Sequence, residues 1–159
     1  MPKLYNKENN ILLEVNLVSN ICLDIEESRN DSENWIPFNF ALNVENEVYL
    51  FKTETNPSFS VFEIRNLIAN FEQVIQAKQQ KEKTKKYEFS SSESYFDIIV
   101  YDPFEDNELY IELWINMGSF TRGSSKGFDK GFRFPVMIES FDKFTMDIKK
   151  QLLSILDQI

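Results

Sequence analysis

The order and periodicity of the hydrophobic segments predict an α+β fold, in which an antiparallel β-sheet of about six to eight strands packs with two amphipathic helices. Several short segments alternate apolar and polar residues, as strands with one buried face do. Two longer segments, one central and one C-terminal, carry apolar residues at helical spacing. At 159 residues, the chain is expected to form a single domain over residues 1–159.

The N-terminal third is predicted to be β-structure. Residues 11–19 and 21–25 are short apolar segments typical of strands, and the polar segment 27–34 is expected to be a loop. Residues 35–44, WIPFNFALNV, alternate cleanly and predict a strand. Residues 48–52 are expected to return beside it as the second strand of a hairpin.

A capping-box pair marks the start of the central helix. Glu63 follows Ser60 by three residues, the spacing at which each side chain caps the backbone amide of the other residue. The apolar residues that follow at helical spacing are Ile64, Leu67, Ile68, Phe71, Val74 and Ile75. Residues 78–86 then carry five lysines and one glutamate, which we interpret as cations that complement the dipole at the helix C-terminus.

The second half of the chain is predicted to return to β-structure. Residues 86–91, 95–102 and 108–117 are expected to form an antiparallel meander. A basic, glycine-rich loop over residues 118–131 follows, and residues 132–139, FRFPVMIE, are expected to form a further strand.

The last helix is expected to begin with Ser140 as its cap. Its apolar residues lie at spacings of three and four: Phe141, Phe144, Ile148, Leu152, Ile155 and Ile159. Because each of the two long helices has a single apolar stripe, both need a sheet face or each other, and a two-layer sandwich satisfies this requirement.

The composition excludes several classes of function. A formal net charge of -9 argues against a nucleic-acid ligand, because phosphate binding requires a basic footprint. The chain has no histidine, and its single cysteine, Cys22, precedes acidic residues that disfavour a reactive thiolate. We therefore predict no catalytic residues, no metal site and no cofactor.

The same composition indicates where the protein acts and what it binds. A lone cysteine suits a reducing compartment, and the sequence contains neither a signal-peptide pattern nor an apolar run of roughly 18 residues. We expect a cytoplasmic protein without a membrane partner, whose acidic balance favours a basic protein partner. The oligomeric state is left open.

An acidic hairpin is the candidate binding surface. Residues 87–112 hold eight carboxylates and no lysine or arginine, and strand alternation is expected to direct the charged and aromatic side chains to one outer face. Tyrosine and tryptophan are enriched at protein interfaces, and surrounding anions would attract a basic partner. The predicted partner-binding residues are Tyr95, Asp97, Tyr101, Glu105, Asp106, Glu108, Tyr110, Glu112 and Trp114.

Other interpretations of this hairpin remain open. Its outer face would be an ordinary solvated surface, or the basic loop 118–131 would fold back and neutralise it. The protein would otherwise be a structural or adaptor protein that self-associates through a sheet edge. A carboxylate-based, metal-dependent enzyme using Asp97 and Glu112 is a further alternative, although no metal-loop spacing is present.

The element order resembles that of a known family. The segments WIPFNFALNV and VYLF, an amphipathic helix, then YEFSS, FDIIVYD and LYIELWIN, and finally GFRFPVMIESFDKFTMDIKKQLLSIL are similar to the WapI-like immunity proteins of bacterial polymorphic toxin systems. The resemblance covers the chain from Trp35 to the C-terminus and leaves residues 1–34 unaccounted for. It implies a non-enzymatic toxin inhibitor in the cytosol, of the kind used in contact-dependent inhibition, that binds a cognate and often nuclease-type toxin.

Overall fold

The computed structural model describes residues 1–19, 23–52, 57–104 and 107–158. It confirms the α+β class, with nine strands and three helices in these described residues. Two features differ from expectation: the strands form two antiparallel sheets rather than one, and a third helix of four residues lies in the predicted basic loop. A single antiparallel meander was too simple because α1 separates two sets of strands that pair only among themselves.

The first sheet has the strand order β1-β2-β3-β4, and β5 pairs with the N-terminal end of β3. Its strands are β1 (Lys3–Tyr5), β2 (Ile11–Leu17), β3 (Trp35–Val44), β4 (Glu47–Phe51) and β5 (Ser58–Ser60). The second sheet has the order β6-β7-β8-β9. Its strands are β6 (Tyr87–Ser90), β7 (Phe96–Tyr101), β8 (Glu108–Asn116) and β9 (Asp129–Met137). The helices are α1 (Val61–Gln79), α2 (Met117–Phe120) and α3 (Ile138–Leu156).

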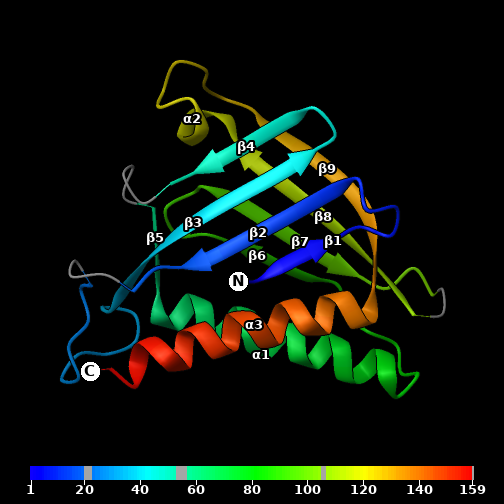
Figure 1. Cartoon of the computed structure of the whole chain (residues 1–159), viewed down its shortest axis with the longest axis horizontal. Helices are drawn as coiled ribbons and strands as arrows, with labels where there is room; N and C mark the ends of the chain where they lie inside the picture. Colours follow the sequence, from blue (N-terminus) through cyan, green and yellow to red (C-terminus); the bar gives the residue numbers. More distant parts are fainter. Residues whose placement is uncertain (20–22, 53–56, 105–106, 159) are drawn as a thin grey trace.

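The two sheets pack face to face through phenylalanines. Their strands cross at a steep angle, and α1 and α3 lie side by side below them (Figure 1). Phe40 of β3 stacks on Phe96 of β7 with ring centroids 4.6 Å apart, and Phe71 and Phe141 join the two helices at 4.7 Å. Aromatic pairs of this kind add to the free energy gained by burial. The core is therefore continuous from the sheets to the helices.

The predicted start of α1 is confirmed. The Ser60 hydroxyl accepts a hydrogen bond from the Glu63 backbone N–H at 3.2 Å, and the Glu63 carboxylate accepts one from the Ser60 N–H at 2.8 Å. The other oxygen of Glu63 accepts from the Ser92 N–H at 2.7 Å. This buried carboxylate therefore caps the helix and also anchors the turn between β6 and β7.

The prediction that Ser140 caps the last helix is wrong. Helix α3 begins at Ile138 directly after β9, and its N-cap, Met137, makes no side-chain capping bond. The Ile138 N–H, one of the first-turn amides that lack a partner within the helix, donates to the Asn107 carbonyl at 2.8 Å.

Three short elements also depart from the predicted pattern. The expected strand over residues 21–25 falls partly outside the described residues, and its Asp24 forms only an isolated bridge with Trp35. The three-residue strands β1 and β5 were not predicted, because three residues cannot display a period. Short pairings like these depend on tertiary context.

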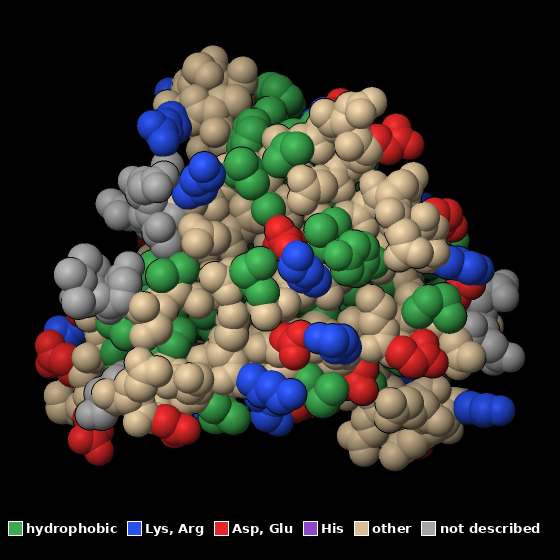
Figure 2. All heavy atoms as spheres, viewed as in Figure 1, with side chains coloured by type: hydrophobic (Ala, Val, Ile, Leu, Met, Phe, Trp, Pro, Cys, Tyr) green, Lys and Arg blue, Asp and Glu red, His purple; other side chains and the backbone are tan. Residues whose placement is uncertain are grey.

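The face made by β1–β4 and α3 carries mixed charge. Figure 2 shows positive and negative side chains interspersed over it, without a block of either sign. The Lys3–Glu14 pair, 2.8 Å apart on neighbouring strands, is one example. No helix in the described residues has the length and apolar character that crossing a bilayer requires.

Candidate partner-binding surface

The outer face of the β6–β9 sheet is built by strict alternation along β7 and β8. Directly opposed pairs on this face are Asp97 with Trp114, Ile99 with Glu112, and Tyr101 with Tyr110. The residues between them point into the core and are buried, whereas these six are half-buried or exposed. The predicted residues Asp97, Tyr101, Glu108, Tyr110, Glu112 and Trp114 therefore share one surface, which we call the outer face.

The remaining predicted residues are not part of this face as described. Tyr95 precedes β7, and its ring packs against Phe38 at 5.7 Å and Phe51 at 5.3 Å, between the two sheets. The predicted alternation began one residue too early, because β7 starts only at Phe96. Glu105 and Asp106 lie outside the described residues.

The expectation that the hairpin's charge is uncompensated is wrong for Glu112. Strand β9 places Arg133 directly opposite Glu112, and the guanidinium donates two hydrogen bonds to one carboxylate oxygen, at 2.6 and 3.0 Å. Trp114 Nε1 donates to the other oxygen at 3.3 Å. Burial alone raises the pKa of Glu112, but the hydrogen bonds from Arg133 and Trp114 outweigh it and hold the pKa below its ordinary value.

Two further carboxylates near this face are neutralised by lysines that sequence spacing did not bring together. Lys7, in the β1–β2 loop, bonds Glu108, and Lys86 lies 2.6 Å from Glu88. Among the described residues, Asp97 makes no ion pair. The outer face is thus nearly balanced in charge rather than strongly acidic.

The basic loop is not what neutralises the outer face. Lys130, at its C-terminal end, bonds Glu47 at 2.9 Å and the Tyr49 hydroxyl, both on β4 of the other sheet. These bonds fasten the start of β9 across the sandwich. The compensating charge on the outer face comes instead from Arg133 within β9 and from Lys7 and Lys86.

Trp114 lies flat across the neighbouring strand because Gly131 leaves room for it. A methyl group at Gly131 would come within 2.5 Å of indole Cζ3 and 2.7 Å of Cδ2. The indole remains 39% exposed. Glycine in a strand often marks such a close approach, so the Gly131 position was a signal in the sequence that the first prediction did not use.

The middle of the outer face is aromatic. The rings of Tyr101 and Tyr110 stack with centroids 5.6 Å apart and an interplanar angle of 12°. The Arg133 guanidinium lies 5.9 Å above the Tyr101 ring. Trp, Tyr and Arg are the residue types that dominate binding energy at protein interfaces. Here they lie next to one another on the paired strands β7, β8 and β9.

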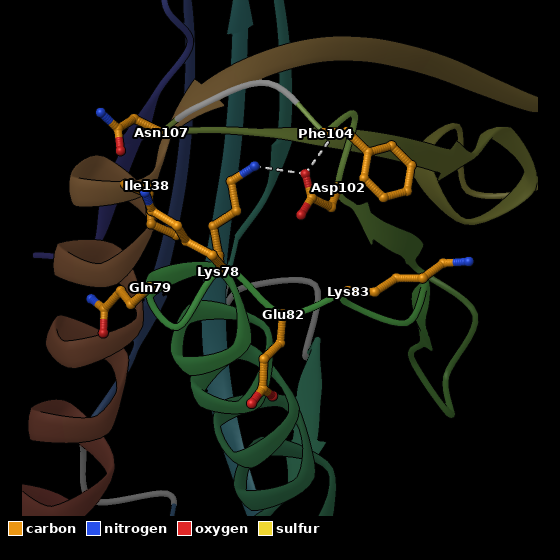
Figure 3. A pocket seen from close by; sticks show the side chains of 9 residues that line it. Lys78, Gln79, Glu82, Lys83, Asp102, Phe104, Asn107 and Ile138 are labelled. Atoms are coloured by element: carbon orange, nitrogen blue, oxygen red, sulfur yellow. Dashed lines mark hydrogen bonds and ion pairs between the residues drawn. The ribbon is translucent and has the colours of Figure 1, made fainter.

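A separate hollow of about 440 Å³ lies where α1 ends beside the turn after β7. Figure 3 shows Lys78 reaching Asp102, and the two charged atoms are 2.6 Å apart. Both side chains are nearly buried, at 11% and 7% exposure, while Phe104 stands out in solvent. Within the described ranges, no group of three or more potential metal ligands forms here or elsewhere.

Comparisons with known proteins give a fold neighbour and a family. The solved structure titled "Structure of the plant transcriptional regulator PBF-2" has a TM-score of 0.50 and 13% identity, and the match covers 98% of this chain and 81% of that one. At that identity the likeness concerns the fold alone. Comparison with curated proteins gives no match.

The family match extends over nearly all of the chain. It covers residues 3–155 and therefore includes the N-terminal strands that the resemblance drawn from the sequence had left out. Because the matching description is that of the immunity protein WapI-like family, this chain belongs to the WapI-like immunity protein family.

Proposed function

We propose that this immunity protein neutralises a cognate toxin by covering it with the outer face, without chemistry of its own. Family membership supports the immunity role. The observation that carries the choice of surface is the run of Trp114, Tyr101 and Tyr110 on one open face, flanked by the Glu112–Arg133 pair. Hot spots combine such aromatic anchors with a polar rim that excludes water.

The toxin proposed is a basic, nuclease-type protein of the cytoplasm. A nuclease must present cations to its phosphate substrate, and a chain of net charge -9 is attracted to such a surface at long range. Since the ion pairs of the outer face are already formed, charge contributes mainly to the rate of encounter. The aromatic centre then determines how long the complex lasts.

A test compares two equally exposed aromatic residues on opposite sheets. The cognate toxin domain is expressed with the wild type, with Trp114→Ala or with Tyr5→Ala, and growth and affinity are measured. Trp114 is 39% exposed and Tyr5 is 40% exposed. Trp114→Ala is expected to weaken binding by roughly 30-fold, the scale of a hot-spot loss, and to abolish protection. Tyr5→Ala is expected to change neither.

Circular dichroism and a urea midpoint establish that both variants fold. Equal affinities for folded Trp114→Ala and wild type would remove the outer face from the proposal. If both variants still protect cells and both keep the wild-type affinity, the toxin contact lies elsewhere on the molecule.

A further inference from the structure

A second open surface lies on the other side of the edge strand β6. Here α1 and β6 form the two walls of a hollow of about 750 Å³, and a second hollow of about 320 Å³ continues it toward the C-terminal end of α1. Asn70 and Tyr87 line both hollows, so they are two parts of one channel. We call this channel the α1–β6 groove.

The β6 wall of the groove offers unpaired main-chain groups. In the 4-stranded sheet, β6 is one of the two edge strands. Ser91 N–H donates to the Phe96 carbonyl at 3.2 Å, so hydrogen-bonded pairs recur at Phe89 and Tyr87, two and four residues earlier. The N–H and C=O groups of Glu88 and Ser90 therefore point away from β7. No main-chain hydrogen bond from the described loops or helices reaches these two residues.

The α1 wall is suited to a peptide backbone. Its groove-lining residues recur at spacings of three and four along one side of the helix: Phe62, Asn66, Asn70, Gln73 and Ala77. The three middle residues carry amide side chains, which can donate to a carbonyl and accept from an N–H. That of Asn70 also donates to the Asn66 carbonyl at 2.7 Å. At 1.5 Å per residue, this stripe is about 22 Å long, which is the length of six or seven extended residues.

The two ends of the groove differ in chemistry. One end is apolar, with Trp35 and the half-exposed ring of Phe62. The other end holds Lys83 and Lys85, which form no ion pair within the described part of the chain. Figure 3 shows Lys83 extending away from the end of α1. Thr84, between these lysines, has a covered hydroxyl without a hydrogen-bond partner among the described residues.

We infer that the α1–β6 groove binds an extended segment of a partner protein as an added strand of the β6–β9 sheet. The segment runs antiparallel to β6 and places a large apolar side chain against Trp35 and Phe62. About four to six residues later it places carboxylates beside Lys83 and Lys85, a separation set by the rise of a strand. Main-chain bonds give affinity, and the two ends give direction and specificity. This inference concerns a surface separate from the outer face and does not require the proposed toxin contact.

A random 12-residue peptide library displayed on phage, panned against the full chain, provides the probe. Enrichment is expected for peptides with an aromatic or large aliphatic residue followed by Asp or Glu four to six positions later. The strongest peptide is then synthesised, and its affinity is measured by fluorescence anisotropy. N-methylation at alternate residues distinguishes strand addition: methyl groups on the amides that face β6 are expected to abolish binding, and those on the intervening amides are not.

Matched variants assign the binding to the groove. The charge reversal Lys83→Glu with Lys85→Glu is expected to weaken the peptide by about tenfold or more, because attraction becomes repulsion. Trp114→Ala, on the outer face, is expected to leave peptide affinity unchanged even where it loses the toxin. Light scattering establishes whether the free chain is a monomer.

Three results would overturn the inference. One is a library that yields no such pattern, and another is a peptide whose affinity ignores both the lysine reversal and the N-methyl position. The third is a dimer of this chain that pairs through β6 and dissociates when the peptide methylated on the intervening amides is added. That result would show that a second copy of this chain occupies the edge. Unchanged toxin binding by Trp114→Ala, together with the expected peptide binding in the groove, would count against the proposed function alone.

Discussion

The outer face and the α1–β6 groove lie on opposite sides of the same edge strand, but they differ in which groups are left unpaired. On the outer face, β7 and β8 are inner strands, so every main-chain group has a neighbour, and the charged side chains are largely paired. In the groove, the main chain of Glu88 and Ser90 is open, and Lys83 and Lys85 have no ion-pair partner among the described residues.

This difference determines how each surface can recognise a partner. The outer face can offer only side chains, so single substitutions of its rings should remove much of its binding energy. The groove offers a backbone edge, which tolerates many sequences and responds to substitution mainly at its two ends. The following substitutions test whether binding at one surface is independent of binding at the other.

The largest effect is expected where the two surfaces share a support. Asp102 follows β7, accepts a hydrogen bond from the Phe104 N–H at 2.8 Å, and pairs with Lys78 of α1. Asp102→Ala leaves a nearly buried ammonium without this carboxylate, so the free energy of unfolding should fall by about 3 kcal/mol, measured in urea. Partner binding at both surfaces should weaken together, since α1 loses one of its attachments to the second sheet.

The double variant Lys78→Met with Asp102→Ala is the control for this prediction. Removing both charges eliminates the ammonium that has lost the Asp102 carboxylate, and most of the lost stability should return. Equal instability of the single and double variants would mean that the loss comes from the turn at Phe104 rather than from the buried charge.

A smaller effect, confined to the outer face, is expected from Gly131→Ala. The added methyl group collides with the indole of Trp114, so the ring must move away from its position over β9. The free energy of unfolding should fall by about 1 to 2 kcal/mol, the usual consequence of overpacking, while peptide binding in the groove stays unchanged. A change in tryptophan fluorescence reports the displaced ring.

A double-mutant cycle isolates this contact. In a Trp114→Ala background the methyl group has room, and Gly131→Ala should then be close to neutral. A cost that is the same in both backgrounds would show that Gly131 is needed for its backbone and not for the indole.

Much of the outer face was predictable because alternation is a local property. Asp97, Glu112 and Trp114 project from one surface as the period of two requires. The same rule failed at Tyr95, where the strand had not begun and the ring turned toward Phe51. The capping box of Ser60 and Glu63 was predictable for the same local reason.

The charge balance was not predictable because it depends on which strands become neighbours. Arg133 opposes Glu112 only through the register of β8 with β9, and Lys7 reaches Glu108 across 101 positions of the sequence. The start of α3 similarly depends on a neighbouring segment, because the Asn107 carbonyl accepts from the Ile138 N–H two residues before the expected Ser140 cap. Counting charges along a segment therefore overestimated the acidity of the surface that it forms.

A pH-dependent effect is expected from Arg133→Ala. Hydrogen bonds from Arg133 help to hold the pKa of Glu112 below its ordinary value, so the pair stabilises the fold above that ordinary value, near 4.3, and is lost as the pH falls through the lower one. The urea midpoint of Arg133→Ala should be lower than that of the wild type at pH 7. The two midpoints should converge once the pH has fallen below the lowered pKa of Glu112, where this carboxyl is protonated in both proteins.

Lys126→Ala is the control for this pH dependence. Lys126 is exposed and makes no ion pair among the described residues, so its removal should shift the midpoint little and equally at all pH values. A gap between the wild type and Arg133→Ala that persists after Glu112 is protonated would mean that Arg133 stabilises the sheet through its contact with the Tyr101 ring rather than through the carboxylate.

The smallest effect is expected at Lys86, where the two surfaces meet. Its ammonium lies 2.6 Å from Glu88, but more than half of each side chain is exposed, and water screens such a pair. Lys86→Ala should leave the urea midpoint within error of the wild type. It should lower the affinity for a groove peptide with an acidic end by less than the Lys83 and Lys85 reversal does. The reason is that the Lys86 ammonium already interacts with the Glu88 carboxylate. A peptide that loses as much affinity with Lys86→Ala as with that reversal would show that the Lys86–Glu88 pair opens on binding, and the groove would then depend on the outer face for one of its cations.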